Sequence, residues 1–381
     1  MDEGARLEQL HRRIREEIRA GSGSISFARF MEMALYEPGL GYYESNATRV
    51  GCAGDFYTSV SVGPLFGELL ALRFLTWLKS LPQFAERSWS WVECGAHDGR
   101  LARDLLTALD RHPAERDRIE YVILEPSERR RFWQKANLKP WTGRVRWIDS
   151  LPAEGIHGVI FSNELLDAFP VHRIGWNASD RRWFEWGVGG SDTGFAWRLM
   201  SANATTVNAT EWPDLPPELT AVLPDGFCTE VHTAATCWWH QAAAALRDGW
   251  LLTLDYGMEG LDFFHPQRSN GTLRAYKNHR VSADLLASPG DQDLTAQVNF
   301  SVLQKAGEAA GLTTVERIGQ RQWLTAILRE TLDTLGARVP LAEEFSWTPE
   351  RVRHFQTLTH PDHLGRGFSV LAQRRTPPAD Q

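Results

Sequence analysis

Polar residues that could hold a small ligand follow four predicted strands, at the point where each strand ends. They form the clusters Glu93-Cys94-Gly95, Glu125-Pro126-Ser127, Asp149-Ser150 and Ser162-Asn163-Glu164. In an open α/β sheet, ligands bind outside the carboxyl ends of the strands, so we expect these clusters to lie together. Carboxylates and amides suit a ligand with hydroxyl and amine groups, whereas they would repel a pyrophosphate.

A glycine turn follows the first of these strands, in the stretch WVECGAHDGRLARDLL. Gly95 and Gly99 are spaced as G-x-x-x-G, and His97 stands where the G-x-G-x-x-G fingerprint of dinucleotide sites would favour another glycine. A strand, a glycine turn and a helix are nevertheless the usual geometry of a nucleotide site. Glu125 is the candidate acid for a ribose diol. His97 either contacts the ligand or faces water from the loop.

Alternating strand and helix patterns must position these residues. From Trp89 onward, short apolar runs alternate with helical patterns, which predicts a doubly wound α/β sheet covered on both faces. Residues 171 to about 228 interrupt the alternation and predict a β-rich insertion with hairpins. Residues 1 to about 86 favour helices and loops, with Leu10, Ile14 and Ile18 at helical spacing. The expected strands include 89–94, 119–125 and 144–149, and the expected helices include 100–110 and 128–137.

Composition limits the classes of protein to which the chain can belong. It has 381 residues, of which 43% are hydrophobic, and its net charge of −7 argues against binding to a nucleic-acid backbone. Four cysteines without a C-x-x-C pair predict reduced thiols and no metal site. Without a long apolar run or a targeting pattern, we expect a cytoplasmic protein with no membrane span. Sixteen tryptophans serve either the core or an apolar partner surface, such as that of a homodimer.

A set of longer motifs is more specific than the glycine spacing. The motifs are YEPGLGYY (36–43), GDFYTS (54–59), PLFGELL (64–70), VECGAHDGRLARDLL (92–106), ILEPS (123–127), SNELLDAFPVHR (162–173), LDYG (254–257), GTLRAYKNHRV (271–281) and DLTAQVNFSVL (293–303). Through them the chain resembles the MidA family of S-adenosylmethionine-dependent methyltransferases, which includes a mitochondrial arginine methyltransferase that assists assembly of respiratory complex I. The resemblance implies a class I methyltransferase (Rossmann-like) fold. It also implies an N-terminal helical cap over 1–86 and a methyltransferase domain over 87–381, with the insertion at about 171–228.

The resemblance also implies which residues hold the cofactor, S-adenosylmethionine. They are Glu93, Gly95 and Gly99 in the loop, Glu125 at the ribose, Asp149 near the adenine, and Thr58 and Ser59 from the cap. The sequence departs from the family pattern in two places. His97 replaces the middle glycine of E-x-G-x-G-x-G, and Val60-Ser61 replaces a Pro-Glu pair. A β-carbon at residue 97 either crowds the methionine part of the cofactor or is tolerated by the loop if the φ angle stays negative.

NELLDAFP resembles the family segment that lines the methyl-transfer pocket. We expect Glu164 and Asp167 to bind the acceptor guanidinium and Asn163 to fix the loop. If the segment is helical, the two carboxylates share a face because they are three residues apart. The alternative is that Asp167 only braces the turn that follows it. His172 and His279 are further candidates, although a structural role is the simpler interpretation of each.

The sequence therefore predicts an S-adenosylmethionine-dependent methyltransferase that acts on arginine in a protein substrate. One alternative is a nicotinamide-dependent oxidoreductase, which the absence of G-x-G-x-x-G and of a Tyr-x-x-x-Lys relay disfavours. The other is a non-catalytic assembly factor that retains a degenerate cofactor site. His97 and Val60-Ser61 support that interpretation, whereas the retained Glu125 and NELLD oppose it.

Overall fold

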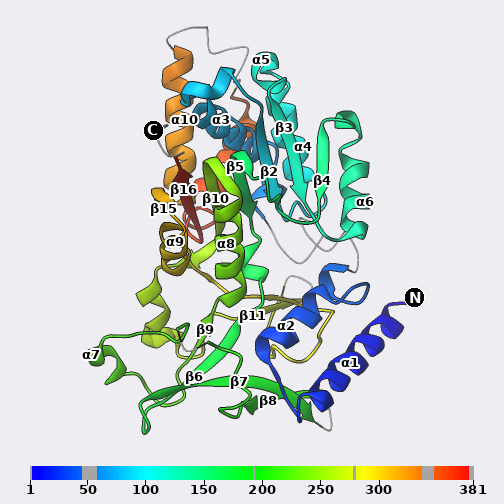
Figure 1. The fold of residues 1–381 in the computed structure, drawn as a ribbon, viewed down its shortest axis with the longest axis vertical. Helices are drawn as coiled ribbons and strands as arrows, with labels where there is room; N and C mark the ends of the chain where they lie inside the picture. Colours follow the sequence, from blue (N-terminus) through cyan, green and yellow to red (C-terminus); the bar gives the residue numbers. More distant parts are fainter. Residues whose placement is uncertain are drawn as a thin grey trace. The chain divides into compact units, whose positions relative to one another are not determined.

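The computed structural model describes residues 2–44, 58–191, 194–208, 210–277, 280–336 and 347–376. The chain divides into two compact units, each assembled from three separate segments. The first unit comprises Met1–Asn46, Leu166–Trp238 and Met258–Leu303, and the second comprises Ala47–Leu165, Trp239–Gly257 and Gln304–Gln381. Figure 1 shows the helices and strands of both units.

A sheet with the strand order β15-β16-β10-β5-β2-β3-β4 forms the centre of the second unit. From β10 to β4 neighbouring strands are parallel, whereas β16 lies antiparallel between β10 and β15. The strands are β2 (Trp89–Cys94), β3 (Ile119–Leu124), β4 (Val145–Ile148), β5 (Ile156–Asn163), β10 (Leu246–Met258), β15 (Thr313–Gly319) and β16 (Phe368–Arg375). The predicted doubly wound sheet is therefore confirmed.

In the second unit, the helices after β2 and β3 lie where the sequence pattern predicted them. They are α3 (Leu65–Lys79), α4 (Arg100–Leu109), α5 (Pro113–Arg116), α6 (Glu128–Asn137), α10 (Gln320–Gly336) and α11 (Pro349–Thr359). Three 3-10 helices accompany them: η3 (Ser59–Val62), η4 (Pro82–Ala85) and η5 (Lys139–Trp141). Two further helices, α8 (Thr233–Ala245) and α9 (Phe300–Ala309), each begin in the first unit and end in the second.

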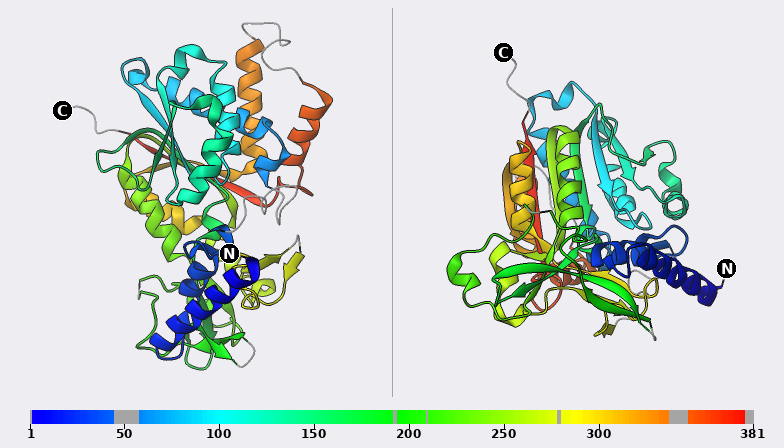
Figure 2. Two further views of the ribbon diagram at one scale, coloured as in Figure 1. Left: turned by 90° about the vertical axis from the view of Figure 1, so that its right-hand side faces the viewer. Right: turned by 60° about the horizontal axis from the view of Figure 1, so that its bottom comes forward.

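Helices cover both faces of the central sheet, which can be followed from two other directions in Figure 2. One face packs against α3, α4 and α10 in a continuous apolar core that contains Phe74, Trp91 and Trp323. On the other face, Trp239 of α8 donates a hydrogen bond from Nε1 to Oε1 of Gln373 on β16, over 2.8 Å. Because successive strand residues point to opposite faces, both faces of the strands must be apolar or paired, which explains the continuous apolar runs in the sequence.

The first unit holds the insertion, which forms an antiparallel sheet. Its strand order is β1-β7-β6-β9, with β8 beside β7, and a smaller sheet has the order β12-β11-β13. The strands of these two sheets are β1 (Ile25–Ser26), β6 (His172–Asn177), β7 (Arg182–Ser191), β8 (Gly194–Leu199), β9 (Cys228–Val231), β11 (Arg274–Lys277), β12 (Arg280–Ser282) and β13 (Asp293–Thr295). The short strand β14 (Val298–Asn299) belongs to neither of them and pairs with β10. The helices are α1 (Glu3–Ala20), α2 (Phe27–Tyr36), α7 (Pro217–Thr220), η1 (Tyr42–Glu44), η6 (Leu166–Ala168), η7 (Gly260–Phe264) and η8 (Pro266–Arg268).

Helix α1 packs on the first unit through the apolar stripe seen in the sequence. Leu10, Ile14 and Ile18 are buried in a core that also contains Phe30 of α2 and Val188 of β7. Asp2 caps the helix, because its side chain accepts a hydrogen bond from the backbone of Ala5. The predicted packing of this amphipathic helix is confirmed.

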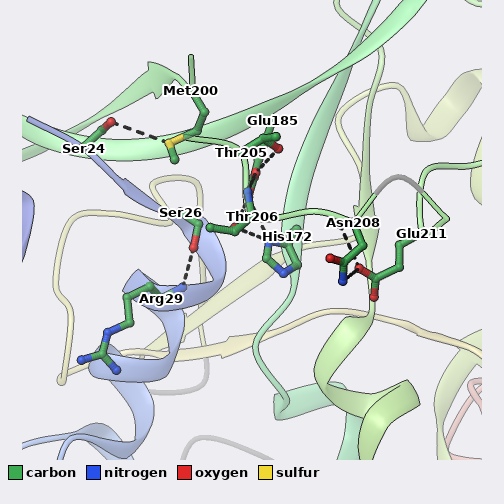
Figure 3. A network of polar contacts seen from close by, with 10 residues as sticks. All are labelled: Ser24, Ser26, Arg29, His172, Glu185, Met200, Thr205, Thr206, Asn208 and Glu211. Atoms are coloured by element: carbon green, nitrogen blue, oxygen red, sulfur yellow. Dashed lines mark hydrogen bonds and ion pairs between the residues drawn. The ribbon is translucent and has the colours of Figure 1, made fainter. Parts of the chain in front are cut away.

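A buried carboxylate organises the polar side of the inserted sheet. Glu185 of β7 lies 2.8 Å from Nδ1 of His172 and accepts hydrogen bonds from the hydroxyls of Thr205 and Thr206 and from the Thr206 backbone. Figure 3 shows this network. Although burial acts to raise the pKa of Glu185, these neighbours lower it to about 2. The pair of Glu185 and His172 therefore attaches the segment after β8 to the sheet.

The N-terminal region differs from the expected helical cap over residues 1–86. Helices α1 and α2 belong to the first unit, whereas α3 belongs to the second, because its nearly continuous apolar surface is buried in the core of the central sheet. The expectation of helices and loops alone was also wrong at β1, where Ile25 pairs with Val188 and completes the edge of the inserted sheet. Within the described residues, no helix is both long and apolar enough to cross a membrane.

Candidate active site

The carboxyl ends of four parallel strands carry the polar clusters that the sequence singled out. β2 ends at Cys94, β3 at Leu124, β4 at Ile148 and β5 at Asn163. β2 pairs with β3 on one side and with β5 on the other, although β5 comes later in the chain. This reversal of strand order is a topological switch point, which is where open α/β sheets bind ligands.

The loop between β2 and α4 alternates left-handed residues. The φ angles are 78° at Gly95, 45° at His97 and 86° at Gly99. A β-carbon at Gly95 would lie 2.7 Å from Cδ1 of Leu165. A side chain there would therefore be strained by the positive φ angle and would be too close to Leu165. The condition of a negative φ at His97 is not met, because the turn closed by the 2.7 Å bond from the Gly99 backbone N to Ala96 O places residue 97 in the left-handed region.

Glu93 is buried inside the sheet at the end of β2. It is 3% exposed and accepts a 2.7 Å hydrogen bond at Oε2 from the hydroxyl of Tyr121 on β3. Burial raises the pKa of Glu93 to about 8, although the Tyr121 hydrogen bond acts in the opposite direction. A cation placed beside this carboxyl group would favour its ionised form.

Glu125 follows β3, and neighbouring groups hold its carboxylate. Its Oε1 accepts a hydrogen bond from the Ser127 backbone at 3.0 Å, and its Oε2 accepts one from Nε2 of Gln134 at 3.1 Å. Nη1 of Arg130 lies 4.0 Å from Oε2. Asp149, after β4, has an exposed side chain that forms an ion pair with Arg131 of α6. Helix α6 therefore contacts both strand-end carboxylates.

Thr58 and Ser59 begin the short helix η3. The Thr58 side chain accepts a hydrogen bond from the Ser61 backbone, and the Ser61 hydroxyl accepts one from the Thr58 backbone, so Ser61 completes a capping box. Ser59 is buried, and its backbone N donates to Oε1 of Glu164 over 3.1 Å. Residues 54–57 of the GDFYTS motif lie outside the described part of the chain.

Glu164 stands immediately beyond β5 in a left-handed conformation with a φ of 50°. Its Oε1 accepts hydrogen bonds from Ser59 N and from Nδ2 of Asn163, the latter over 3.0 Å. The backbone N of Glu164 donates to Leu254 O on β10 over 2.9 Å. The structure therefore brings Asn163, Glu164 and Ser59 together in the second unit.

The condition under which Glu164 and Asp167 would share one helical face is not met. β5 extends to Asn163, and only Leu166–Ala168 form the 3-10 helix η6. Asp167 belongs to the first unit, where its carbonyl accepts a hydrogen bond from Ala296 N over 2.8 Å. His172 is also in the first unit, beside Glu185, and His279 lies outside the described residues.

Asp255 on β10 was missed as a candidate in the sequence. It is fully buried, and its Oδ2 accepts a hydrogen bond from Leu165 N over 3.2 Å, so it supports the turn that carries Glu164. The signal was present in the LDYG motif, whose polar residue interrupts an apolar strand. Among the described residues, no cluster of His, Cys, Asp or Glu side chains is arranged to hold a metal ion.

Comparison with known families decides the class of protein. A family model described as "Putative S-adenosyl-L-methionine-dependent methyltransferase" matches residues 69–318, which is more than half of the chain. The chain belongs to this methyltransferase family. It is therefore an enzyme that uses S-adenosylmethionine, and it has the class I methyltransferase fold expected from the motifs.

Solved structures support the assignment of this methyltransferase. A methyltransferase-like protein from Burkholderia thailandensis, crystallised with S-adenosylhomocysteine, is 33% identical, with a TM-score of 0.79. The match covers 97% of this chain and 93% of that one. A second crystal structure from the same organism gives a TM-score of 0.78 at 32% identity.

Curated relatives of the methyltransferase extend the comparison to animals. The protein from Drosophila melanogaster named "Protein arginine methyltransferase NDUFAF7 homolog, mitochondrial" is 26% identical over 97% of this chain and 86% of its own length. The human protein arginine methyltransferase NDUFAF7 is 24% identical over 92% of this chain and 80% of its own length. The prediction of a cytoplasmic location was wrong on this comparison, because these relatives are named as mitochondrial.

Proposed function

We propose that this methyltransferase transfers its methyl group to arginine side chains of a protein substrate. The names of the animal relatives as protein arginine methyltransferases support this choice of acceptor. The structural observation that carries it is the orientation of Glu164. A guanidinium group is nearly always protonated, so an enzyme that positions it needs a carboxylate with a defined direction.

Two donors hold the Glu164 carboxylate. Ser59 N and Asn163 Nδ2 both donate to Oε1, and the left-handed backbone of Glu164 turns the chain just beyond the strand. A carboxylate that is already oriented loses little conformational freedom when it binds a partner. Glu164 is therefore suited to align an acceptor guanidinium at the ligand-binding edge of the sheet, and Asn163 is suited to fix that alignment.

The reaction requires alignment and proton removal more than covalent catalysis. S-adenosylmethionine supplies an electrophilic methyl group when it is bound. The chain must hold the acceptor nitrogen in line with that group and exclude water. As the nitrogen–carbon bond forms and the carbon–sulfur bond breaks, the acceptor loses one proton. Glu164 is the group proposed to stabilise the positive charge and to accept that proton.

We further propose that the strand-end residues hold the cofactor. The buried Glu93 carboxyl suits the ammonium group of its methionine part, and the Glu125 carboxylate suits its ribose hydroxyls. The left-handed turn between Gly95 and Gly99 directly follows β2, at the edge of the sheet where the cofactor is proposed to bind. Asp149 is the candidate for the adenine, and Thr58 and Ser59 are candidates through η3.

Asp167 is proposed as a second carboxylate for the acceptor. Its position in η6, directly after the turn that carries Glu164, supports the proposal. An experiment can distinguish this role from the alternative, in which Asp167 only braces the turn that follows it. Replacement of Asp167 by Asn would lower kcat/KM with an unchanged melting temperature if it binds the acceptor, and would lower the melting temperature if it braces the turn.

The test is methyl transfer from radiolabelled S-adenosylmethionine to a mixture of arginine-containing synthetic peptides. Glu164→Gln is expected to lower kcat/KM by about a hundredfold or more, because it removes a charged group at the reacting atoms. Its affinity for S-adenosylhomocysteine is expected to stay within about threefold of the unchanged protein, because glutamine keeps an oxygen that can accept the hydrogen bond from Ser59 N.

Glu120→Gln is the matched control, because Glu120 is a half-exposed carboxylate on β3 whose two oxygens accept hydrogen bonds from Arg146. Full turnover by Glu164→Gln would refute the acceptor assignment. Labelling of lysine peptides in place of arginine peptides would refute the proposed acceptor. A homodimer remains a separate prediction, which sedimentation of the purified chain tests.

A further inference from the structure

Gln134 of α6 is a fully buried polar residue whose side chain is hydrogen-bonded on every side. Its Nε2 donates to the His97 carbonyl over 3.0 Å and to Oε2 of Glu125 over 3.1 Å. Its Oε1 accepts a 2.9 Å hydrogen bond from Nε1 of Trp147 on β4. Because an indole nitrogen only donates, Trp147 fixes the orientation of the amide, and both amide hydrogens face acceptors.

The two acceptors belong to different parts of the site. One is the carbonyl of the left-handed His97 in the β2–α4 loop, and the other is the carboxylate of Glu125, which follows β3. One turn further along α6, Asn137 donates from Nδ2 to the Asp98 carbonyl over 2.8 Å. Residues three apart lie on one face of a helix, so α6 presents two amides to consecutive carbonyls of the loop.

This contact explains how a residue with a β-carbon can occupy position 97. A left-handed conformation costs a non-glycine residue about 1 to 2 kcal/mol, so neighbouring contacts must maintain it. The hydrogen bonds from Gln134 and Asn137 hold the carbonyls of His97 and Asp98, which belong to the two peptide groups on either side of the Asp98 Cα. α6 also lies close to the second glycine, since a β-carbon at Gly99 would meet the Gln134 Cα at 3.4 Å.

We propose that Gln134 is a positioning residue for the cofactor, which sets the His97 loop and the Glu125 carboxylate at a fixed distance from each other. The proposal rests on the ribose-binding role proposed for Glu125. Gln134 acts on two groups at once. Its single amide links the His97 loop, beside the methionine part of the cofactor, to Glu125, beside the ribose. Loss of the amide would release both, without removing any group that touches the cofactor.

The test measures the affinities of the full chain for S-adenosylhomocysteine and for its 2′-deoxy analogue by calorimetry. The unchanged protein is expected to prefer the ribose form by about tenfold, the effect of one hydrogen bond to a charged group. Gln134→Met keeps the volume and removes all three hydrogen bonds. We expect it to bind S-adenosylhomocysteine about tenfold more weakly and to lose most of its preference for the 2′-hydroxyl, because Glu125 loses the hydrogen bond that orients its Oε2.

Gln373 provides a matched control, because it is an equally buried glutamine with the same kinds of partner. Trp239 Nε1 donates to its Oε1, and its Nε2 donates to the Gln304 carbonyl and the Thr314 hydroxyl. Gln373→Met is expected to lower the melting temperature and to leave both affinities unchanged. If Gln134→Met also loses stability but keeps the ribose preference, its role is purely structural and the proposal is overturned.

A second variant covers the case in which Gln134→Met does not fold. Gln134→Glu places a carboxylate against Glu125 and the His97 carbonyl, and only its protonated form can donate to Glu125 and accept from Trp147. Its affinity relative to the unchanged protein is expected to recover as the pH falls, and a pH-independent ratio would contradict the proposal. If the unchanged protein shows no preference for the 2′-hydroxyl, the ribose-binding role of Glu125 is refuted, and the proposal for Gln134 falls with it.

Discussion

The hydroxyl of Tyr121 donates a 2.7 Å hydrogen bond to Oε2 of Glu93 within the central sheet. Trp91 is the register partner of Tyr121, so the bond joins neighbouring parallel strands just before they end. Both residues are buried, and Tyr121 is the donor that opposes the effect of burial on the Glu93 pKa. The protonation of Glu93 therefore depends on a residue that faces the core.

The stability of the unliganded protein is expected to fall as the pH rises towards 8. The folded state retains the Glu93 proton up to a pKa of about 8, whereas the unfolded state loses it near 4.5, so rising pH favours unfolding between these values. The slope approaches about 1.4 kcal/mol per pH unit. Urea unfolding at several pH values from 5 to 9 measures how the free energy of unfolding changes with pH. Glu93→Gln should remove this contribution, and Tyr121→Phe should extend it to higher pH.

Binding of S-adenosylhomocysteine near pH 7 is expected to release about one proton, because its ammonium group favours the ionised form of Glu93. Calorimetric titration in two buffers with different ionisation enthalpies counts the protons. Glu93→Gln should bind without this release. Identical heats in both buffers for the unchanged protein would place the ammonium group elsewhere.

Replacements at residue 97 are expected to separate backbone strain from side-chain contacts. With a φ of 45°, His97→Gly should be more stable than His97→Ala by about 1 kcal/mol, because alanine keeps the β-carbon in a left-handed conformation. Urea unfolding of the two variants gives the difference. Equal stability would mean that the loop adopts another conformation once the imidazole is removed.

The acid side of the stability profile is expected to depend on Glu185. Its pKa of about 2 lies below the ordinary value of 4.5, so the unfolded state binds more protons between these values and stability is lost as the pH falls through them. Glu185→Gln should flatten the profile in this range, when unfolding is followed by tryptophan fluorescence. Glu218→Gln, which changes an exposed carboxylate of α7, should leave the profile unchanged.

The central sheet could be predicted from the sequence because its strands are short apolar runs between clear helical patterns. The expected strand 89–94 and the expected helix 128–137 coincide with β2 and α6. The division into units could not be predicted in this way. α3 and α1 are both helical in pattern, and only their tertiary packing assigns them to different cores.

The candidate site was predictable only where its residues follow strands. Glu93, Glu125 and Glu164 could be selected because polar residues at strand ends mark ligand sites. Tyr121 and Gln134 could not, because a tyrosine in a strand and a glutamine in a helix have no distinctive spacing. Their partners become visible only when β3 and α6 are packed. The left-handed backbone of His97 was likewise hidden, since residue type alone argues against it.

The division of the chain into interleaved segments has a consequence for synthesis. The chain passes between the two units five times, so no single cut separates them. β16, near the C-terminus, pairs with β10 over eight residues, and until it emerges from the ribosome that edge of the sheet is open. The second unit therefore cannot complete its sheet until residues 368–375 have emerged, and it depends on late, long-range contacts that a chain truncated before β16 would lack.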